Sequence, residues 1–202
     1  PYTNPVDFWE YDPTLDTWTQ KANFGGQARK RAVAFAIGSK GYVATGDTGI
    51  FGNGFTNDLW EYDAAFNTWT QKTNFGGIAR HGAIGFAIGN KGYVGTGEDI
   101  SLNLYSDFWE YNPSLDTWSQ KTNFWGGLRA GATAFAIGNK GYVGLGFNQS
   151  WHQNDFWEYD QTANTWTQKA SLPDSTRLDA FEFTINGYGF VGGGFGGSLT
   201  SC

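Results

Sequence analysis

The sequence predicts an all-β protein built from one repeated antiparallel sheet, and three observations carry this prediction. A hairpin-like pattern recurs four times, beginning at Asp7, Asp58, Asp107 and Asp155, so that successive copies are 51, 49 and 48 residues apart. This spacing is typical of architectures that repeat one supersecondary unit. The repeats are rich in aromatic and β-branched residues, which favour pleated, half-buried strands. No stretch approaches the roughly 20 apolar residues of a membrane helix or shows a helical period.

The recurring pattern reads as strand, turn and strand. In the first copy, residues 8–11 (Phe-Trp-Glu-Tyr) and 17–20 (Thr-Trp-Thr-Gln) flank the segment 12–16 (Asp-Pro-Thr-Leu-Asp). Proline after aspartate presets a turn, and aspartate or asparagine tolerates the exit geometry. The pattern therefore predicts a β-hairpin.

A second pair of strands completes each repeat. Residues 32–37 and 41–45 form this pair in the first copy, joined by residues 38–40 (Gly-Ser-Lys), with counterparts around Phe86, Phe135 and Phe183. Apolar and aromatic runs bounded by glycine are typical of strands and hairpins. Each repeat is thus predicted to form a four-stranded antiparallel sheet.

The position of the aromatic residues gives the pattern a family resemblance. In every copy a tyrosine precedes a tryptophan by seven residues: Tyr11 and Trp18, Tyr62 and Trp69, Tyr111 and Trp118, Tyr159 and Trp166. This resembles the kelch repeat, which is about fifty residues long. The kelch family also ends its second strand with adjacent glycines, which only residues 192–194 keep; Gly-x-Gly stands at residues 95–97 and 144–146, and Ala-Thr-Gly at 44–46. The resemblance covers almost the whole chain and implies a β-propeller, related in fold to secreted bacterial kelch-like proteins and to the central domain of galactose oxidase.

The repeats predict one domain over residues 1–202, with units near 7–57, 58–106, 107–154 and 155–202. The chain begins with the third and fourth strands of a blade and ends with the first and second. We therefore expect residues 1–20 to complete the terminal blade and close a ring of four blades, which removes exposed strand edges. The alternatives are part of a larger propeller, or pairing with a second chain into eight blades.

Composition excludes several classes of protein. The 202 residues are 40% hydrophobic and 18% aromatic, enough for the core of one domain. A net charge of −6 without a basic cluster argues against a nucleic-acid partner, and membrane insertion is not expected. Cys202 is the single cysteine, so an internal disulfide framework is excluded and intermolecular pairing stays open. The start at Pro1 without methionine fits a processed secreted protein or a segment of a longer one. The thiol-poor composition favours an extracellular or cell-surface location.

Differences between the repeats locate the expected functional face. The turns within each strand pair are nearly invariant, whereas the connections 47–57, 98–106 and 147–154 differ from one another. In an up-and-down blade these connections lie on one face of the disc. Because loops on a rigid scaffold tend to carry binding residues, we expect the site there.

Two sets of side chains are candidates for ligand contacts. Four arginines share one phase of the repeat and are expected to ring the mouth of the central channel, where their guanidinium groups suit a carboxylate or another anion: Arg29, Arg80, Arg129 and Arg177. The alternative is that each arginine braces neighbouring blades through a carboxylate such as Glu10, Glu61, Glu110 or Glu158. The second set consists of loop aromatics outside the repeat phase, which suit sugar stacking or a protein partner: Phe51, Phe55, Tyr105, Trp125, Phe147, Trp151 and His152. The alternative is packing within the loops. The eight tryptophans in the repeat phase are expected in the core.

No catalytic constellation stands out. A copper enzyme similar to galactose oxidase would need a histidine and tyrosine metal set and a cross-linked cysteine, and the histidines His81 and His152 lie in separate repeats. No metal or other cofactor is predicted, because the loop carboxylates lack a hard-cation spacing. The expected function is a non-catalytic binding module for a glycan or a protein. The second hypothesis is a structural protein that stacks or polymerises. The third is a kelch-type sugar-acid isomerase that uses the arginines with Asp179 and Glu182.

Overall fold

The computed structural model describes residues 5–49, 54–173 and 176–196, and within them every regular element is a β-strand. Three complete sheets have four antiparallel strands each. Blade 1 contains β3 (Val33–Ile37), β4 (Lys40–Ala44), β5 (Leu59–Asp63) and β6 (Thr68–Lys72). Blade 2 contains β7 (Ile84–Ile88), β8 (Lys91–Gly95), β9 (Phe108–Asn112) and β10 (Thr117–Lys121). Blade 3 contains β11 (Thr133–Ile137), β12 (Lys140–Gly144), β13 (Phe156–Asp160) and β14 (Thr165–Lys169).

Two half-blades flank these sheets. The N-terminal half-blade is the hairpin of β1 (Trp9–Asp12) and β2 (Thr17–Gln20), and the C-terminal half-blade is the hairpin of β16 (Phe181–Ile185) and β17 (Tyr188–Gly192). A short pair, β15 (Arg177–Leu178) and β18 (Phe195–Gly196), lies beside the latter. No helix among the described residues is long and apolar enough to cross a membrane.

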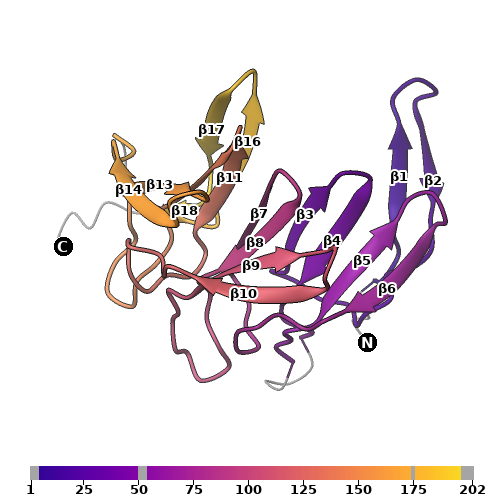
Figure 1. Ribbon diagram of the computed structural model, residues 1–202, viewed down its shortest axis with the longest axis horizontal. Helices are drawn as coiled ribbons and strands as arrows, with labels where there is room; N and C mark the ends of the chain where they lie inside the picture. The colour runs from indigo at the N-terminus through magenta and orange to yellow at the C-terminus, as the bar shows by residue number, and fades with distance from the viewer. Residues whose placement is uncertain (1–4, 50–53, 174–175, 197–202) are drawn as a thin grey trace.

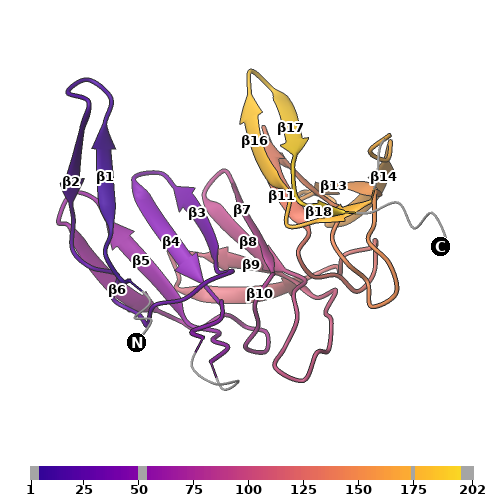
Figure 2. The same cartoon turned by 180° about the vertical axis from the view of Figure 1, so that it is seen from behind.

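The sheets follow one another around an arc (Figures 1 and 2). Their inner strands pack in chain order, β3 on β7, β7 on β11 and β11 on β16. This is the blade arrangement of a β-propeller, as the sequence predicts. The half-blades, however, lie at opposite ends of the arc and form separate two-stranded sheets. The predicted joining of β1 to β17 within the chain is therefore wrong for this structure, because each half-blade packs on its own neighbouring blade.

Local chemistry explains the hairpins. The turn of blade 1 is held by Asp63, whose Oδ1 accepts the backbone N–H groups of Ala65 and Phe66 at 2.9 and 3.3 Å. The residue before the second strand, Asn67, has a φ of 53°, a left-handed conformation that asparagine and aspartate adopt more readily than most residues. This outcome matches the predicted role of aspartate and asparagine at these turns.

The core lies between the sheets. Between blades 2 and 3, Phe108 packs edge-on against Tyr159 and Trp166, at 4.8 and 5.0 Å between ring centroids. Close approach requires glycine at one position of the second strand: a Cβ on Gly141 would lie 2.4 Å from the ring of Phe86. The recurring small and aromatic residues therefore occupy positions where neighbouring blades contact each other.

Only some repeat-phase tryptophans are in this core. Trp166 is 1% exposed, whereas Trp18, at the same phase, is 66% exposed, and Trp9 is also exposed. The expectation of eight core tryptophans is wrong at the N-terminal half-blade, because no sheet formed by the described residues covers its outer side.

The two edges of the arc differ in sequence. The hairpin turns β1–β2, β3–β4 and β16–β17 point to the upper edge in Figure 1, and the connections between blades and the β8–β9 loop lie below. We call the lower edge the loop face: the β4–β5, β8–β9 and β12–β13 loops, with the connections that lead into β3, β7, β11 and β16.

Candidate functional site

Three of the four candidate arginines are buried behind the loop face as part of the scaffold. Each forms a two-pronged ion pair with the aspartate that precedes the next outer hairpin: Arg29 with Asp58 at 2.5 and 2.8 Å, Arg80 with Asp107 at 2.5 and 3.0 Å, and Arg129 with Asp155 at 2.7 and 3.0 Å. Their guanidinium groups therefore face carboxylates of the protein and do not ring the mouth of the channel.

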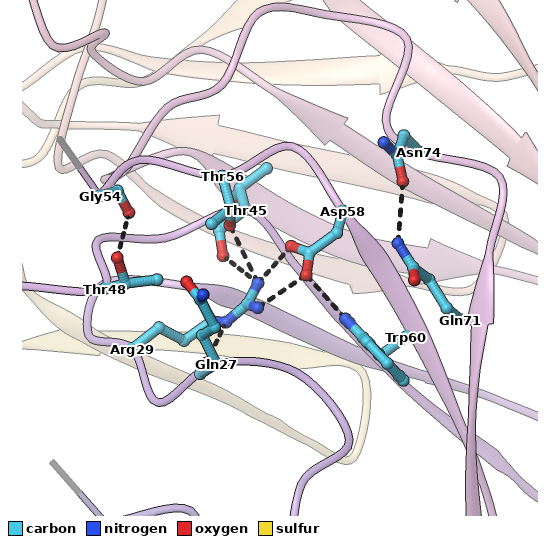
Figure 3. Close-up of polar contacts among 10 residues, drawn as sticks. All are labelled: Gln27, Arg29, Thr45, Thr48, Gly54, Thr56, Asp58, Trp60, Gln71 and Asn74. Carbon is cyan, nitrogen blue, oxygen red and sulfur yellow. Dashed lines mark hydrogen bonds and ion pairs between the residues drawn. The ribbon is translucent and has the colours of Figure 1, made fainter.

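The pair in blade 1 shows how this contact fixes a loop (Figure 3). Arg29 also donates to Thr45 O at 2.9 Å and to Thr56 Oγ1 at 3.0 Å, so it ties the start and end of the β4–β5 loop together. Burial alone would raise the pKa of Asp58, but hydrogen bonds from Arg29 and Trp60 outweigh it and lower that pKa. These arginines therefore pair with carboxylates of the scaffold, as the alternative expected, but Arg29 braces the loop of its own blade and does not join neighbouring blades.

The bracing partner is aspartate, not the predicted glutamate. Glu61 instead accepts a hydrogen bond from Tyr42 Oη at 2.7 Å and lies 3.3 Å from Lys40 Nζ. Arg177 departs from the other three, since it is half-buried in β15 and donates to Gly193 O at 3.2 Å.

Tyr105 also belongs to the scaffold. Its hydroxyl donates to Asp99 Oδ2 at 2.7 Å, and its ring centroid lies 4.2 Å from the guanidinium carbon of Arg80. Asp99 accepts three further hydrogen bonds, from Ser101 N and from Asn103 N and Nδ2. Hydrogen bonds from Asn103 first, and then from its other donors, lower the pKa of Asp99 to about 2. The β8–β9 loop is therefore organised around one carboxylate.

Other predicted loop aromatics pack on neighbouring rings. Phe55 stacks on His81 with 4.2 Å between centroids. His152 lies between Phe147 and Phe195, at 5.9 and 5.8 Å. These contacts correspond to loop packing. Phe51 is outside the described residues.

Trp125 and Trp151 remain as large exposed rings on the loop face, with 55% and 59% of their surfaces exposed. Trp151 follows a turn in which Asn148 Oδ1 accepts its backbone N–H at 3.0 Å, while Gln153 Nε2 donates to its carbonyl at 3.0 Å. The backbone is held and the ring faces solvent.

Trp125 is presented differently. It is an extra residue between Phe124 and Gly126, where the connection into blade 2 runs directly from phenylalanine to glycine. Arg129 Nη2 donates to Gly126 O at 2.5 Å, and Gly127 N donates to Phe124 O at 3.2 Å with a φ of 86° that favours glycine. Further exposed apolar side chains on the same face accompany both tryptophans: Ile78, Ile100, Leu102 and Leu128.

The axial end of the loop face has a polar mouth. Successive blades are joined there by backbone hydrogen bonds from Gly82 N to Arg31 O, from Gly131 N to Gly82 O and from Asp179 N to Gly131 O. All four residues are left-handed, with φ between 52° and 60°. Arg31 Nη2 reaches Asp179 Oδ2 at 3.3 Å, linking the first and last of these positions.

A cavity of about 130 Å³ opens at this mouth, lined by Arg31, His81, Glu98, Phe147 and Asp179 among others. Burial, and then the charge of Arg31, lower the pKa of His81. Its Nδ1 is buried and has no hydrogen-bond partner among the described residues.

Glu182 lines the adjoining channel. Its Oε2 accepts a hydrogen bond from Thr133 Oγ1 at 2.6 Å, and burial raises its pKa. Its hydrogen-bond donor is therefore a threonine of the neighbouring blade. The repeat pattern did not predict Arg31 as a mouth residue. The available signal was that Arg31 and Asp179 stand where the other repeats have glycine.

Comparison with known proteins supports the fold assignment. No protein-family model matches the chain, and no curated protein matches it by sequence. The structure is similar to the solved structure of YjhT, with a TM-score of 0.77 and 19% sequence identity over 90% of this chain. The chain spans 64% of the length of that structure, less than two thirds. At this identity the likeness shows a shared fold, so the chain is an all-β repeat protein with the fold of a β-propeller.

Proposed function

We propose that this chain is a non-catalytic binding module of the kelch type, acting outside the cell or at its surface, whose loop face engages a protein or a glycan. The supporting observation is the pair of exposed tryptophans, Trp125 and Trp151, on backbones that hydrogen bonds already hold. Ordered aromatic side chains anchor partners at low entropic cost.

The same observations narrow the ligand chemistry. Because Arg29, Arg80 and Arg129 are paired with aspartates, we do not assign anion binding to them. Exposed aliphatic residues of the same loop face, such as Ile78 and Leu102, favour a protein partner, since they add apolar contact area. A glycan is the second candidate, because a tryptophan ring can stack on a sugar.

The isomerase reading has less support, since three of the four arginines it requires are engaged in the scaffold. Asp179 and Glu182 do lie near the mouth with Arg31, and they would be its remaining candidates.

The test uses the labelled chain on two arrays, one of glycans and one of secreted and cell-surface proteins. We expect binding on one array that weakens about 5- to 150-fold, equivalent to about 1 to 3 kcal/mol, when Trp125 and Trp151 both become alanine. Phe66→Ala is the matched control, because Phe66 is an exposed ring at a hairpin turn on the other face. Equal binding by both variants, or no binding by the wild-type chain on either array, would contradict the proposal.

A further inference from the structure

One contact joins each sheet to the next along the chain. The tyrosine and tryptophan of an outer hairpin pack against the preceding sheet: Phe8 lies 4.8 Å from Tyr62 and 5.2 Å from Trp69, as Phe108 lies 4.8 Å from Tyr159 and 5.0 Å from Trp166. We call this arrangement the blade joint.

Two hydrogen bonds complete every blade joint. Between blades 2 and 3, Trp166 Nε1 donates to Thr122 O at 3.1 Å, and Asn164 Oδ1 accepts from Thr122 N at 3.0 Å. The same two bonds recur at both earlier joints. At the first, Trp69 Nε1 donates to Ala22 O and Ala22 N donates to Asn67 Oδ1. At the second, Trp118 Nε1 donates to Thr73 O and Thr73 N donates to Asp116 Oδ1.

The N-terminal half-blade carries one side of an unmade joint. The rings of Tyr11 and Trp18 lie 5.1 Å apart at 42°, against 4.9 Å and 44° for Tyr159 and Trp166. Tyr11 Oη donates to Asp16 Oδ1 at 2.8 Å, as Tyr159 Oη donates to Asn164 Oδ1 at 2.9 Å. Tyr11 is nevertheless 44% exposed, whereas Tyr159 is buried. We call the ring pair of Tyr11 and Trp18 the knob. The knob has the geometry of a complete joint, but nothing among the described residues covers it.

The opposite end of the arc carries the other side. A cavity of about 540 Å³ lies between blade 3 and the C-terminal half-blade, lined by Tyr142, Phe156, Ala170, Leu172 and Phe190 among others. One blade earlier, the rings that contact Tyr159 and Trp166 are Tyr93, Phe108 and Phe124. Their counterparts in the repeat are Tyr142, Phe156 and Leu172, in that order, and all three line the cavity. The cavity is therefore a socket for one more tyrosine and tryptophan pair.

The backbone edge of the C-terminal half-blade fits the same hairpin. In blade 3 the second strand pairs with the third, with Gly141 opposite Tyr159 and Val143 opposite Trp157. The edge of β17 away from β16 pairs with no strand among the described residues. β1 has the sequence Trp-Glu-Tyr-Asp, which also occurs in β5 and β13. The blade 3 register transferred to β17 would set Gly189 opposite Tyr11 and Val191 opposite Trp9.

We propose that the N-terminal half-blade of one copy of this chain docks into the socket of a second copy and completes its terminal blade. A second copy is the fitting partner because one molecule presents both halves at opposite ends of the arc (Figure 2). The joint would add hydrogen bonds from Trp18 Nε1 to Ala170 O and from Ala170 N to Asp16. Tyr11 and Trp18, and not Trp9, are the anchors. At the first joint Gly25 leaves room for the ring of Trp60, which is the repeat counterpart of Trp9. Pro173 stands at the position of Gly25 in the socket and leaves no such room.

Sedimentation over a range of concentrations tests this docking. We expect the wild-type chain to associate into species of two or more copies, and Tyr11→Ala with Trp18→Ala to weaken association at least 10-fold. Leu15→Ala is the matched control, because it lies in the turn of the same hairpin and its counterpart Leu115 stays exposed beside a complete joint. A wild-type chain that stays monomeric at every concentration would overturn the proposal.

Mixing separates docking from misfolding. Phe190→Arg should block the socket while the knob stays intact, and the double alanine variant should keep its socket. Each variant alone should associate weakly, and an equimolar mixture should recover one joint and form pairs. A mixture no larger than its components, although both variants unfold cooperatively, would contradict the proposal.

A disulfide distinguishes joining of copies from closure within one chain. In a Cys202→Ser background, Trp9→Cys with Val191→Cys places two thiols on directly opposed antiparallel residues, where Cα separations suit a disulfide. We expect oxidation to give covalent species of two or more chains. A disulfide-bonded single chain, or persistent thiols at concentrations where the chain associates, would overturn the proposed register and partner.

Discussion

Trp166 and Trp18 occupy the same phase of the repeat but lie in opposite environments. Both follow a tilted tyrosine in a similar hairpin geometry, yet Trp166 packs against Phe108 and donates to Thr122 O, whereas Trp18 faces solvent. The repeat sequence therefore determines the hairpin, while the adjacent sheet determines whether the tyrosine and tryptophan of that hairpin are buried in the core. Stability should therefore be unequal along a chain of similar repeats.

The largest expected effect comes from removing the buried ring. Trp166→Ala should destabilise the protein by about 3 to 5 kcal/mol, because a large side chain leaves a cavity between blades 2 and 3. Trp18→Ala, measured in dilute solution, should cost about 0.5 kcal/mol or less, as surface substitutions do. Chemical denaturation of both variants gives the two values, and equal losses would remove the distinction between complete and open joints.

The next effect concerns the buried ion pairs of the complete blades. Asp107→Ala should cost about 3 kcal/mol, because it leaves the guanidinium of Arg80 buried without its carboxylate. Asp16→Ala, in the N-terminal half-blade, is the comparison, since it removes an exposed carboxylate whose hydrogen-bond partner among the described residues is Tyr11. Thermal unfolding should separate the two variants clearly, and similar midpoints would mean that the ion pair is not a brace.

A smaller effect should depend on pH. Hydrogen bonds from Asn103 and its neighbours hold the pKa of Asp99 at about 2, below the usual value for aspartate. The stabilisation by its charge is therefore present above about pH 4 and lost as the pH falls toward 2. Asp99→Asn should lower the melting temperature at pH 6, and the gap from wild type should narrow between pH 4 and 2. A gap that is constant across this range would show that the charge does not stabilise the β8–β9 loop.

The smallest expected effect on folding is at the loop face. Trp151→Ala should change stability by about 0.5 kcal/mol or less, since the ring is exposed and the turn is held by Asn148 through backbone contacts. Circular dichroism melts give the comparison with Trp166→Ala. A loss above about 2 kcal/mol would place Trp151 in the scaffold and weaken its assignment as a binding residue.

Local features were predictable from the sequence. The four hairpins, the Asp or Asn turns and the four-stranded sheets follow from residue patterns that act within a few positions, such as Asp63 with Ala65. The aspartate partner of Arg29 was not predictable in this way, because Asp58 lies 29 residues away and the contact depends on how the loop folds back. The exposure of Trp18 was missed for the same reason, since it depends on which sheet lies beside it.

The candidate site shows the same division. Trp125 and Trp151 were recognisable as aromatics outside the repeat phase, and they are exposed on the loop face. Tyr105 shared that signature but binds Asp99 and covers Arg80. The mouth residue Arg31 carried only the weaker signal of replacing a glycine at a left-handed position. Departure from the repeat therefore located candidate residues but did not separate ligand contacts from internal ones.

Hydrogen exchange by mass spectrometry, measured at several protein concentrations, tests the contrast between complete and open joints most directly. At the lowest concentration we expect slow exchange in β7 to β9 and fast exchange in β1 and β17, with protection of β1 and β17 rising together as concentration increases. Equal protection of β17 and β8 at the lowest concentration would contradict this contrast, because it would mean that the terminal blade is already complete within one chain.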